Sequence, residues 1–203
     1  MPVFSEGYRS QTIRHGPCNR IARERSVTIR KSQGFALIDL IFVIGIIGVL
    51  ASMATPRLFA ARQGAGSASA IGSLRAIASA QLTFALTCGG GFYAPNLTTL
   101  GVPPVGSDAA FLSQNLTGDD IVTRGGYIVQ LLGTAYPGAP GSCNGLAIGE
   151  AGQAYKAAAD PVDVNNNFRY FAINANGAIF EDTVTLFPVM PEVGDPPSGH
   201  VLR

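Results

Sequence analysis

The strongest pattern along the chain is a run of apolar residues from 35 to 54. Sixteen of its 20 positions are apolar, and the other four are Asp39, Gly45, Gly48 and Ser52. The run has no polar face, which argues against a helix that covers a soluble core on one side. As a helix it would be about 30 Å long, the thickness of the hydrocarbon core of a bilayer. The pattern therefore predicts a transmembrane segment.

The helical pattern continues beyond this run. Apolar residues recur at helical spacing, so we expect the helix to extend to about Leu86. Pro56 and the glycines within residues 63–69 are expected to loosen it, and the glycines after Cys88 are expected to end it.

The rest of the chain predicts a small sheet. Strand patterns occupy residues 126–133, 146–149, 168–173 and 178–183. A hairpin turn over 174–177 joins the last two strands, residues 89–124 are expected to form loops, and four prolines predict a flexible tail over 188–203. The predicted fold class is α+β, a long N-terminal helix packed on a small antiparallel sheet.

The net charge of +1 combines two different parts of the chain. Residues 1–34 carry seven basic and two acidic side chains, a charge of +5, and residues 35–203 carry seven basic and eleven acidic ones, a charge of −4. A basic flank keeps its side of a membrane segment in the cytoplasm, so the C-terminal part is expected outside it. Charged residues make up 13% of the chain, which argues against a nucleic-acid partner bound through a basic surface.

Three kinds of membrane segment are considered. A secretory signal peptide cut near residues 52–54 is disfavoured, because the apolar run is long and contains Asp39. An uncleaved signal anchor gives no reason for an acid in the first turn of the helix. A third kind explains both the acid and the residues before it, which are Lys31-Ser-Gln-Gly34 followed by Phe35-Ala-Leu-Ile-Asp39.

This motif resembles the class III signal of type IV pilins and type II secretion pseudopilins over about residues 31–57. The resemblance implies a basic leader, residues 1–34, which a prepilin peptidase removes by cutting between Gly34 and Phe35. It also implies N-methylation of Phe35.

The resemblance further implies a transmembrane and filament-core helix over residues 35–56, with a kink at Pro56. Cleavage creates a cationic N-terminus among apolar helices, and Asp39 supplies an opposite charge in the first helical turn. In the family this acid pairs with the N-terminus of a neighbouring subunit. The family usually has Glu at this position, and Asp is one methylene shorter.

A pilin-like periplasmic head over residues 57–187 is implied in the same way. The implied function is a structural subunit of a pseudopilus or a type IV pilus, with a slight preference for the pseudopilus, and not an enzyme. The implied partners are the prepilin peptidase, other filament subunits, the bacterial inner membrane and its assembly platform. The alternative is a non-assembling, membrane-anchored periplasmic binding domain.

Two cysteines, Cys88 and Cys143, remain once the leader is removed. An even pair in an oxidising compartment predicts a disulfide, worth about 4 kcal/mol by the chain-entropy argument, with two free thiols as the alternative.

Few residues suggest bound ions or catalysis. His15 lies in the leader and His200 in the expected tail, so a histidine-based catalytic device is not expected. No cofactor is expected except calcium, for which Asp160, Asp163 and Asn165 supply oxygen ligands; an ordinary polar turn is the alternative.

Overall fold

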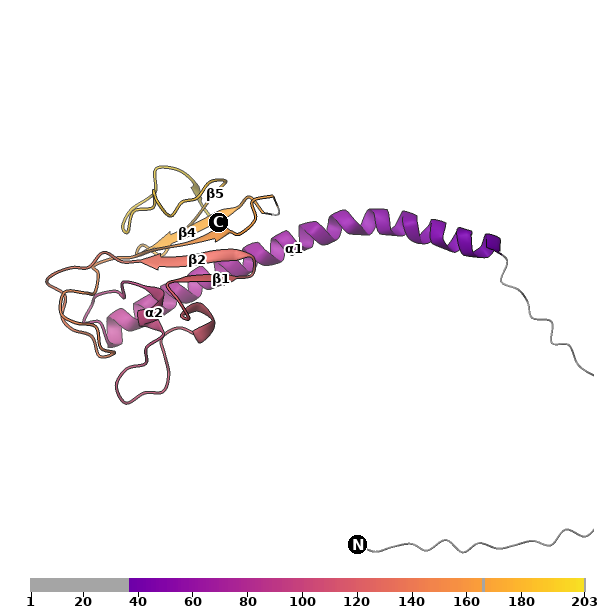
Figure 1. Ribbon diagram of the computed structural model, residues 1–203. Helices are drawn as coiled ribbons and strands as arrows, with labels where there is room; N and C mark the ends of the chain where they lie inside the picture. The colour runs from indigo at the N-terminus through magenta and orange to yellow at the C-terminus, as the bar shows by residue number, and fades with distance from the viewer. Residues whose placement is uncertain (1–36, 166, 203) are drawn as a thin grey trace, which may run out of the picture. The chain divides into compact units, whose positions relative to one another are not determined.

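The computed structural model describes residues 37–165 and 167–202 of the 203-residue chain (Figure 1). They have the α+β arrangement expected from the sequence. The helical elements are α1 (Leu37–Thr87), α2 (Leu97–Leu100) and the 3-10 turn η1 (Gln114–Leu116). The strands are β1 (Ile121–Arg124), β2 (Tyr127–Leu132), β3 (Lys156–Pro161), β4 (Tyr170–Asn174), β5 (Ile179–Asp182) and β6 (His200–Val201).

Helix α1 is 51 residues long and is continuous through Pro56, Gly64 and Gly66. A proline lacks the N–H that would bond to the carbonyl four residues earlier, here that of Ser52. Each glycine costs only about 1 kcal/mol relative to alanine, less than the flanking helical turns and packing can offset. The loosening expected at Pro56 or within residues 63–69 is therefore not visible as a break. A kink at Pro56 stays a prediction.

The glycine run ends α1, as the sequence predicts. The backbone N–H of Gly89 donates to the carbonyl of Phe84 at 2.7 Å. The N–H of Gly91 donates to the carbonyl of Ala85 at 2.9 Å. Gly90 and Gly91 have φ values of +60° and +93°, which glycine adopts without a Cβ clash. These bonds satisfy carbonyls that a helix end leaves without partners.

The six strands form one antiparallel sheet in the order β1-β2-β3-β4-β5-β6. Three of the expected strands are confirmed, since 126–133 contains β2, 168–173 overlaps β4 and 178–183 contains β5. The expected hairpin turn joins β4 to β5. There the N–H of Gly177, at φ +79°, donates to the carbonyl of Asn174 at 2.9 Å.

The other strand predictions were wrong or incomplete. Residues 146–149 form no strand but an irregular segment that ends in a turn, and Gly149 has φ +86°, which a strand does not accommodate. Strand β3 lies in the middle of the sheet but consists largely of alanine, which has a weak preference for strands. Strand β1 falls in the segment expected as loop, and its mostly exposed edge lacks an alternating pattern. Strands β1 and β3 therefore form because they pair with neighbouring strands, and not because of a local sequence pattern.

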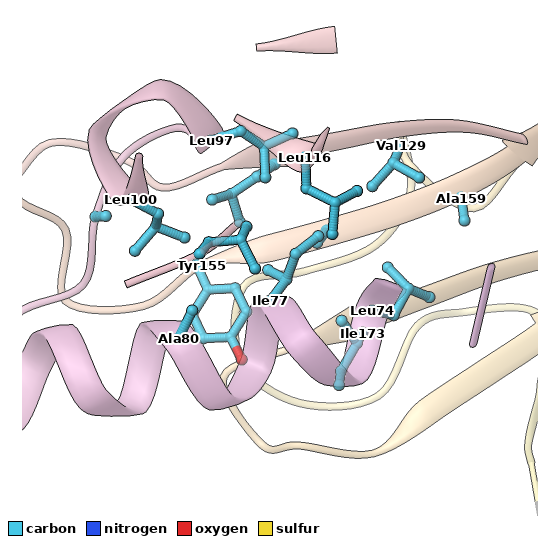
Figure 2. Packing of buried hydrophobic residues seen from close by; sticks show 14 of the residues in the cluster. Leu74, Ile77, Ala80, Leu97, Leu100, Leu116, Val129, Tyr155, Ala159 and Ile173 are labelled. Carbon is cyan, nitrogen blue, oxygen red and sulfur yellow. The ribbon is translucent and has the colours of Figure 1, made fainter. Parts of the chain in front are cut away.

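Alternate residues of the central strands face α1 and form the main core (Figure 2). Val129, Ala159 and Ile173 pack in one cluster with Leu74 and Ile77 of α1, and none of them is more than 1% exposed. Burying a large apolar side chain contributes about 1.5–3 kcal/mol. Alanines on β3 leave room for α1 to approach the sheet closely.

The C-terminal segment covers the opposite face of the sheet. We call residues 184–194 the strap. Its Leu186 and Met190 are 0% and 2% exposed and pack against Phe180 of β5. The flexible tail predicted for residues 188–203 is therefore wrong: its first part is packed, and its last part contains β6, which pairs with β5.

Polar contacts hold the strap in place. The side-chain amide of Asn174, which is fully buried, donates to the carbonyls of Pro191 and Gly194 at 3.1 and 2.6 Å. On the other side, Thr134 donates its N–H and its hydroxyl to Oε1 of Glu192 at 2.8 and 2.6 Å. The bonds from Asn174 satisfy two backbone carbonyls of the strap, and those from Thr134 hold the strap by the side chain of Glu192.

The predicted disulfide is confirmed between Cys88 and Cys143, with their Cα atoms 4.9 Å apart. It joins the end of α1 to a loop 55 residues later. About two turns earlier, the buried amide of Gln81 donates to the carbonyl of Ala94 and accepts from its N–H, both at 2.8 Å. The end of α1 is thus fastened to both following loops.

Candidate functional site

The first candidate site is the N-terminal part of α1, where residues 37–65 are exposed on all sides. An 18-residue window of this helix has a mean hydropathy of 2.5, and α1 is long and apolar enough to cross a membrane. A soluble monomer rarely exposes so large an apolar surface. A membrane or other protein chains would have to cover these side chains: Leu37, Ile38, Leu40, Ile41, Phe42, Val43, Ile44, Ile46, Ile47, Val49, Leu50, Met53, Leu58 and Phe59.

The hydroxyl groups within this segment bond to the helix itself. Ser52 Oγ donates to the carbonyl of Val49 and Thr55 Oγ1 to the carbonyl of Ala51, both at 2.7 Å. Polar groups satisfied in this way cost much less in an apolar environment than unpaired ones. The segment therefore suits a membrane better than its residue types alone suggest, a point that the sequence analysis missed.

The predicted assembly residues lie at the start and end of this segment. Asp39 is in the first turn of α1 and is exposed, so its carboxylate is accessible to another chain. Pro56 lies near the C-terminal end of the apolar run. The cleavage and methylation positions, Gly34 and Phe35, lie outside the described residues.

A second candidate site is a cavity of about 420 Å³ beside α1. It is lined by residues of α1, of the β1–β2 turn and of the segment after β3: Phe59, Arg62, Gln63, Gly66, Gly125, Gly126, Tyr127, Val162, Asp163 and Asn167. No local motif joins these three segments, so the sequence offered no signal for the cavity.

A buried polar network forms one wall of this cavity. Asn167, which is 9% exposed, donates from Nδ2 to Oγ of Ser67 at 3.2 Å and to the carbonyl of Gln63 at 3.3 Å. Ser67 Oγ in turn lies 3.2 Å from the hydroxyl of Tyr127. Burial raises the pKa of Tyr127, so its hydroxyl stays protonated at neutral pH. The network fastens the segment after β3 to α1.

Other titrating groups of the head have structural partners. Burial, reinforced by Tyr93, raises the pKa of Tyr155 to about 12. A bidentate pair with Arg169, including an Nη2–Oε2 bond of 2.8 Å, lowers the pKa of Glu181. The shift of Tyr155 is therefore explained by packing, and that of Glu181 by its ion pair with Arg169.

Two of the three residues proposed for calcium, Asp160 and Asp163, have different neighbours. Asp160 lies on the strap side of β3, where its Oδ2 accepts from Thr185 Oγ1 at 2.6 Å. Asp163 instead lines the cavity beside α1, and its Oδ1 accepts from the N–H of Asn165 at 2.9 Å. In residues 37–165 and 167–202, no group of three or more acidic, histidine or cysteine side chains is gathered for a metal ion. The calcium hypothesis gains no support from this arrangement.

Comparison with protein-family models, with curated proteins and with solved structures finds no match for this chain.

Proposed function

We propose that this chain is a structural subunit of a pilin-like filament, either a type II secretion pseudopilus or a type IV pilus. Residues 35–56 hold the precursor in the bacterial inner membrane with the head in the periplasm. A prepilin peptidase cuts between Gly34 and Phe35, and Phe35 is N-methylated. The mature chains then pack helix to helix through the apolar part of α1.

One observation carries this proposal: an apolar helix, exposed on every side, has an acid in its first turn and continues unbroken into a small α+β head. Exposure on every side suits a segment that passes from lipid into a bundle of like helices. A simple anchor has no use for Asp39, whereas a bundle of cleaved subunits has a cationic N-terminus for it to pair with. The disulfide suits an oxidising compartment.

Processing tests the first half of the proposal. Co-expression with a prepilin peptidase should shorten the chain by its first 34 residues, as measured by intact mass. Gly34→Ala should block this cleavage. Gly45→Ala is the matched control, because a Cβ at Gly45 would meet nothing within 4 Å. An unchanged mass in the presence of an active peptidase would contradict the proposal.

Assembly separates the proposal from the alternative of a non-assembling, membrane-anchored binding domain. Asp39→Asn removes the charge that would pair with a neighbouring N-terminus, so it should abolish crosslinking between subunits in the membrane. Asp39→Glu restores the charge and should restore crosslinking. If Asp39→Asn crosslinked as well as the parent chain, the binding-domain alternative would be favoured.

A further inference from the structure

The cavity beside α1 carries an inference beyond filament assembly. Its walls combine apolar and polar groups, with Phe59 and Val162 on one hand and Gln63 and Asn167 on the other. Asn167 is held by its bonds to α1, so this polar wall is pre-organised. The cavity therefore has the mixed apolar and polar lining of a binding site for a small polar group.

Two opposite charges line the same cavity. Arg62 comes from α1 and Asp163 from the segment after β3, and both residues are exposed. A guanidinium binds phosphate through paired hydrogen bonds, and a carboxylate has several acceptor positions for an ammonium group. A ligand with one phosphate and one ammonium group would match both charges.

The position of the cavity along α1 indicates where such a ligand would come from. The run of exposed large apolar side chains that starts at Leu37 ends at Leu58 and Phe59, which are 54% and 56% exposed. Arg62 follows Leu58 by four residues, which is about 6 Å along a helix axis. A headgroup layer is about 5–8 Å deep on each side of the hydrocarbon core. A membrane segment that ends at Pro56 places Leu58 and Phe59 within the headgroup layer, and it places Arg62, about 9 Å beyond the hydrocarbon core, at the outer edge of that layer.

We propose that this cavity binds the headgroup of a zwitterionic phospholipid of the phosphatidylethanolamine class. Arg62 holds the phosphate and Asp163 the ammonium group, beside the fixed amide of Asn167. The inference rests on the membrane-anchored state in the proposed function, but not on cleavage or assembly. A bound headgroup would hold the base of the head at the outer surface of the membrane until the subunit leaves the bilayer.

Lipid retention by the full-length precursor tests the proposal. The protein would be purified in detergent micelles, titrated with short-chain phosphatidylethanolamine or phosphatidylglycerol, and analysed by native mass spectrometry. Phosphatidylethanolamine should be retained more strongly, because phosphatidylglycerol has no ammonium group. Loss of one charge-assisted contact should weaken retention of phosphatidylethanolamine about tenfold in Arg62→Gln and in Asp163→Asn. Asp163→Asn should leave phosphatidylglycerol retention undiminished.

Arg75→Gln is the matched control, because Arg75 is also an exposed arginine of α1 but does not line the cavity. It should retain phosphatidylethanolamine like the parent chain.

Equal retention of the two lipids by the parent chain, or unchanged retention in Arg62→Gln, would overturn the proposal. Because both cavity residues are exposed, unchanged thermal unfolding of the variants would show that the loss is not due to misfolding. Normal cleavage without lipid selectivity would overturn this inference alone, and lipid selectivity without cleavage would overturn only the filament proposal.

Discussion

Three buried amide side chains join segments of the head that are distant in the sequence. Gln81 bonds to both backbone groups of Ala94, Asn167 bonds to α1, and Asn174 bonds to the strap. An amide can donate and accept at once, so each of these residues replaces backbone hydrogen bonds that an irregular segment cannot make within itself. In the sequence, Asn167 and Asn174 look like ordinary turn residues, because asparagine is common in turns.

Asn174→Ala tests the role of the strap at this scale. The exchange leaves the carbonyls of Pro191 and Gly194 without their donor, and Asn174 is fully buried. We expect the free energy of unfolding to fall by about 1–3 kcal/mol, measured by urea denaturation. Asn115→Ala is the control, because Asn115 is an exposed asparagine of η1, and it should change stability by less than about 0.5 kcal/mol. Equal effects of both exchanges would contradict the assigned role.

Asp160 should make stability depend on pH. Its Oδ1 is buried without a hydrogen-bond partner, and burial raises the pKa of this carboxyl above its ordinary 3.8. The folded protein therefore binds the proton more tightly than the unfolded chain. The resulting stabilisation is complete below the ordinary pKa and is lost as pH rises through the raised one. Asp160→Asn should accordingly gain stability relative to the parent chain as pH rises.

The measurement is the difference in urea midpoint between Asp160→Asn and the parent chain, from about pH 3 to pH 7. Other acids, such as Glu181 with its lowered pKa, titrate in both proteins, so their contribution cancels in the difference. The hydroxyl of Thr185 donates to Asp160 and lowers its pKa, so Thr185→Val should enlarge the pH dependence of stability. A difference that does not vary with pH would contradict the prediction.

At the scale of elements, one helix serves two environments. Residues 37–65 of α1 are exposed, whereas the later turns bury Leu74, Ile77 and Phe84 in the core of the head. The β1–β2 turn approaches α1 closely, since a Cβ at Gly66 would lie 3.1 Å from the carbonyl oxygen of Gly125. Glycines on both sides permit this contact, which also forms the edge of the cavity.

Gly125→Ala tests this contact. Gly125 has φ +59°, and its Cβ would lie 2.6 Å from Ser69 Oγ. Gly126, at φ +83°, has open space instead. Gly126→Ala should therefore cost only the left-handed backbone strain, about 1–2 kcal/mol. Gly125→Ala should cost about 1–3 kcal/mol more from the clash.

Urea denaturation of both variants separates the two contributions. Adding Ser69→Gly to Gly125→Ala removes the atoms that clash, so part of the lost stability should return. If the two glycine variants unfolded at the same urea concentration, the turn would not press against α1 as described.

At the scale of the whole molecule, the folded head is a sheet covered on both faces. α1 covers one face and the strap covers the other, with the two clusters of buried side chains separated by the sheet. Alanines at the centre of β3 contribute to both faces, because successive residues of a strand point to opposite sides. The C-terminal segment is thus a structural layer and not an appendage.

Truncation tests this layering. A chain ending at Asp195 keeps the strap and loses β6, so it should still unfold cooperatively, with reduced stability. A chain ending at Thr183 exposes Phe180 and the alanines beside it, and we expect it to lose cooperative unfolding and to bind a hydrophobic dye. Far-UV circular dichroism during heating distinguishes the two outcomes. Cooperative unfolding of the shorter chain would show that the strap is dispensable.

The sequence by itself determined the features that depend on local or compositional physics. The apolar run predicted a membrane-compatible helix from its length, the glycines after Cys88 predicted where that helix ends, and the Asn-Gly turn over 174–177 predicted the β4–β5 hairpin. The disulfide followed from two remaining cysteines and their expected compartment. The first three signals lie within short stretches of the sequence. The fourth depends on the number of cysteines that remain after the leader.

The tertiary structure alone decided the features that depend on contacts between distant residues. The alanines of β3 became a central strand only because β2 and β4 pair with them. The prolines of the tail became a packed strap because Asn174 and Thr134 supply hydrogen bonds that the tail cannot make itself. The cavity beside α1 combines three separate segments, and Asp160 and Asp163, close in sequence, face different surroundings. Sequence patterns report local periodicity, whereas burial and pairing are set by partners far along the chain.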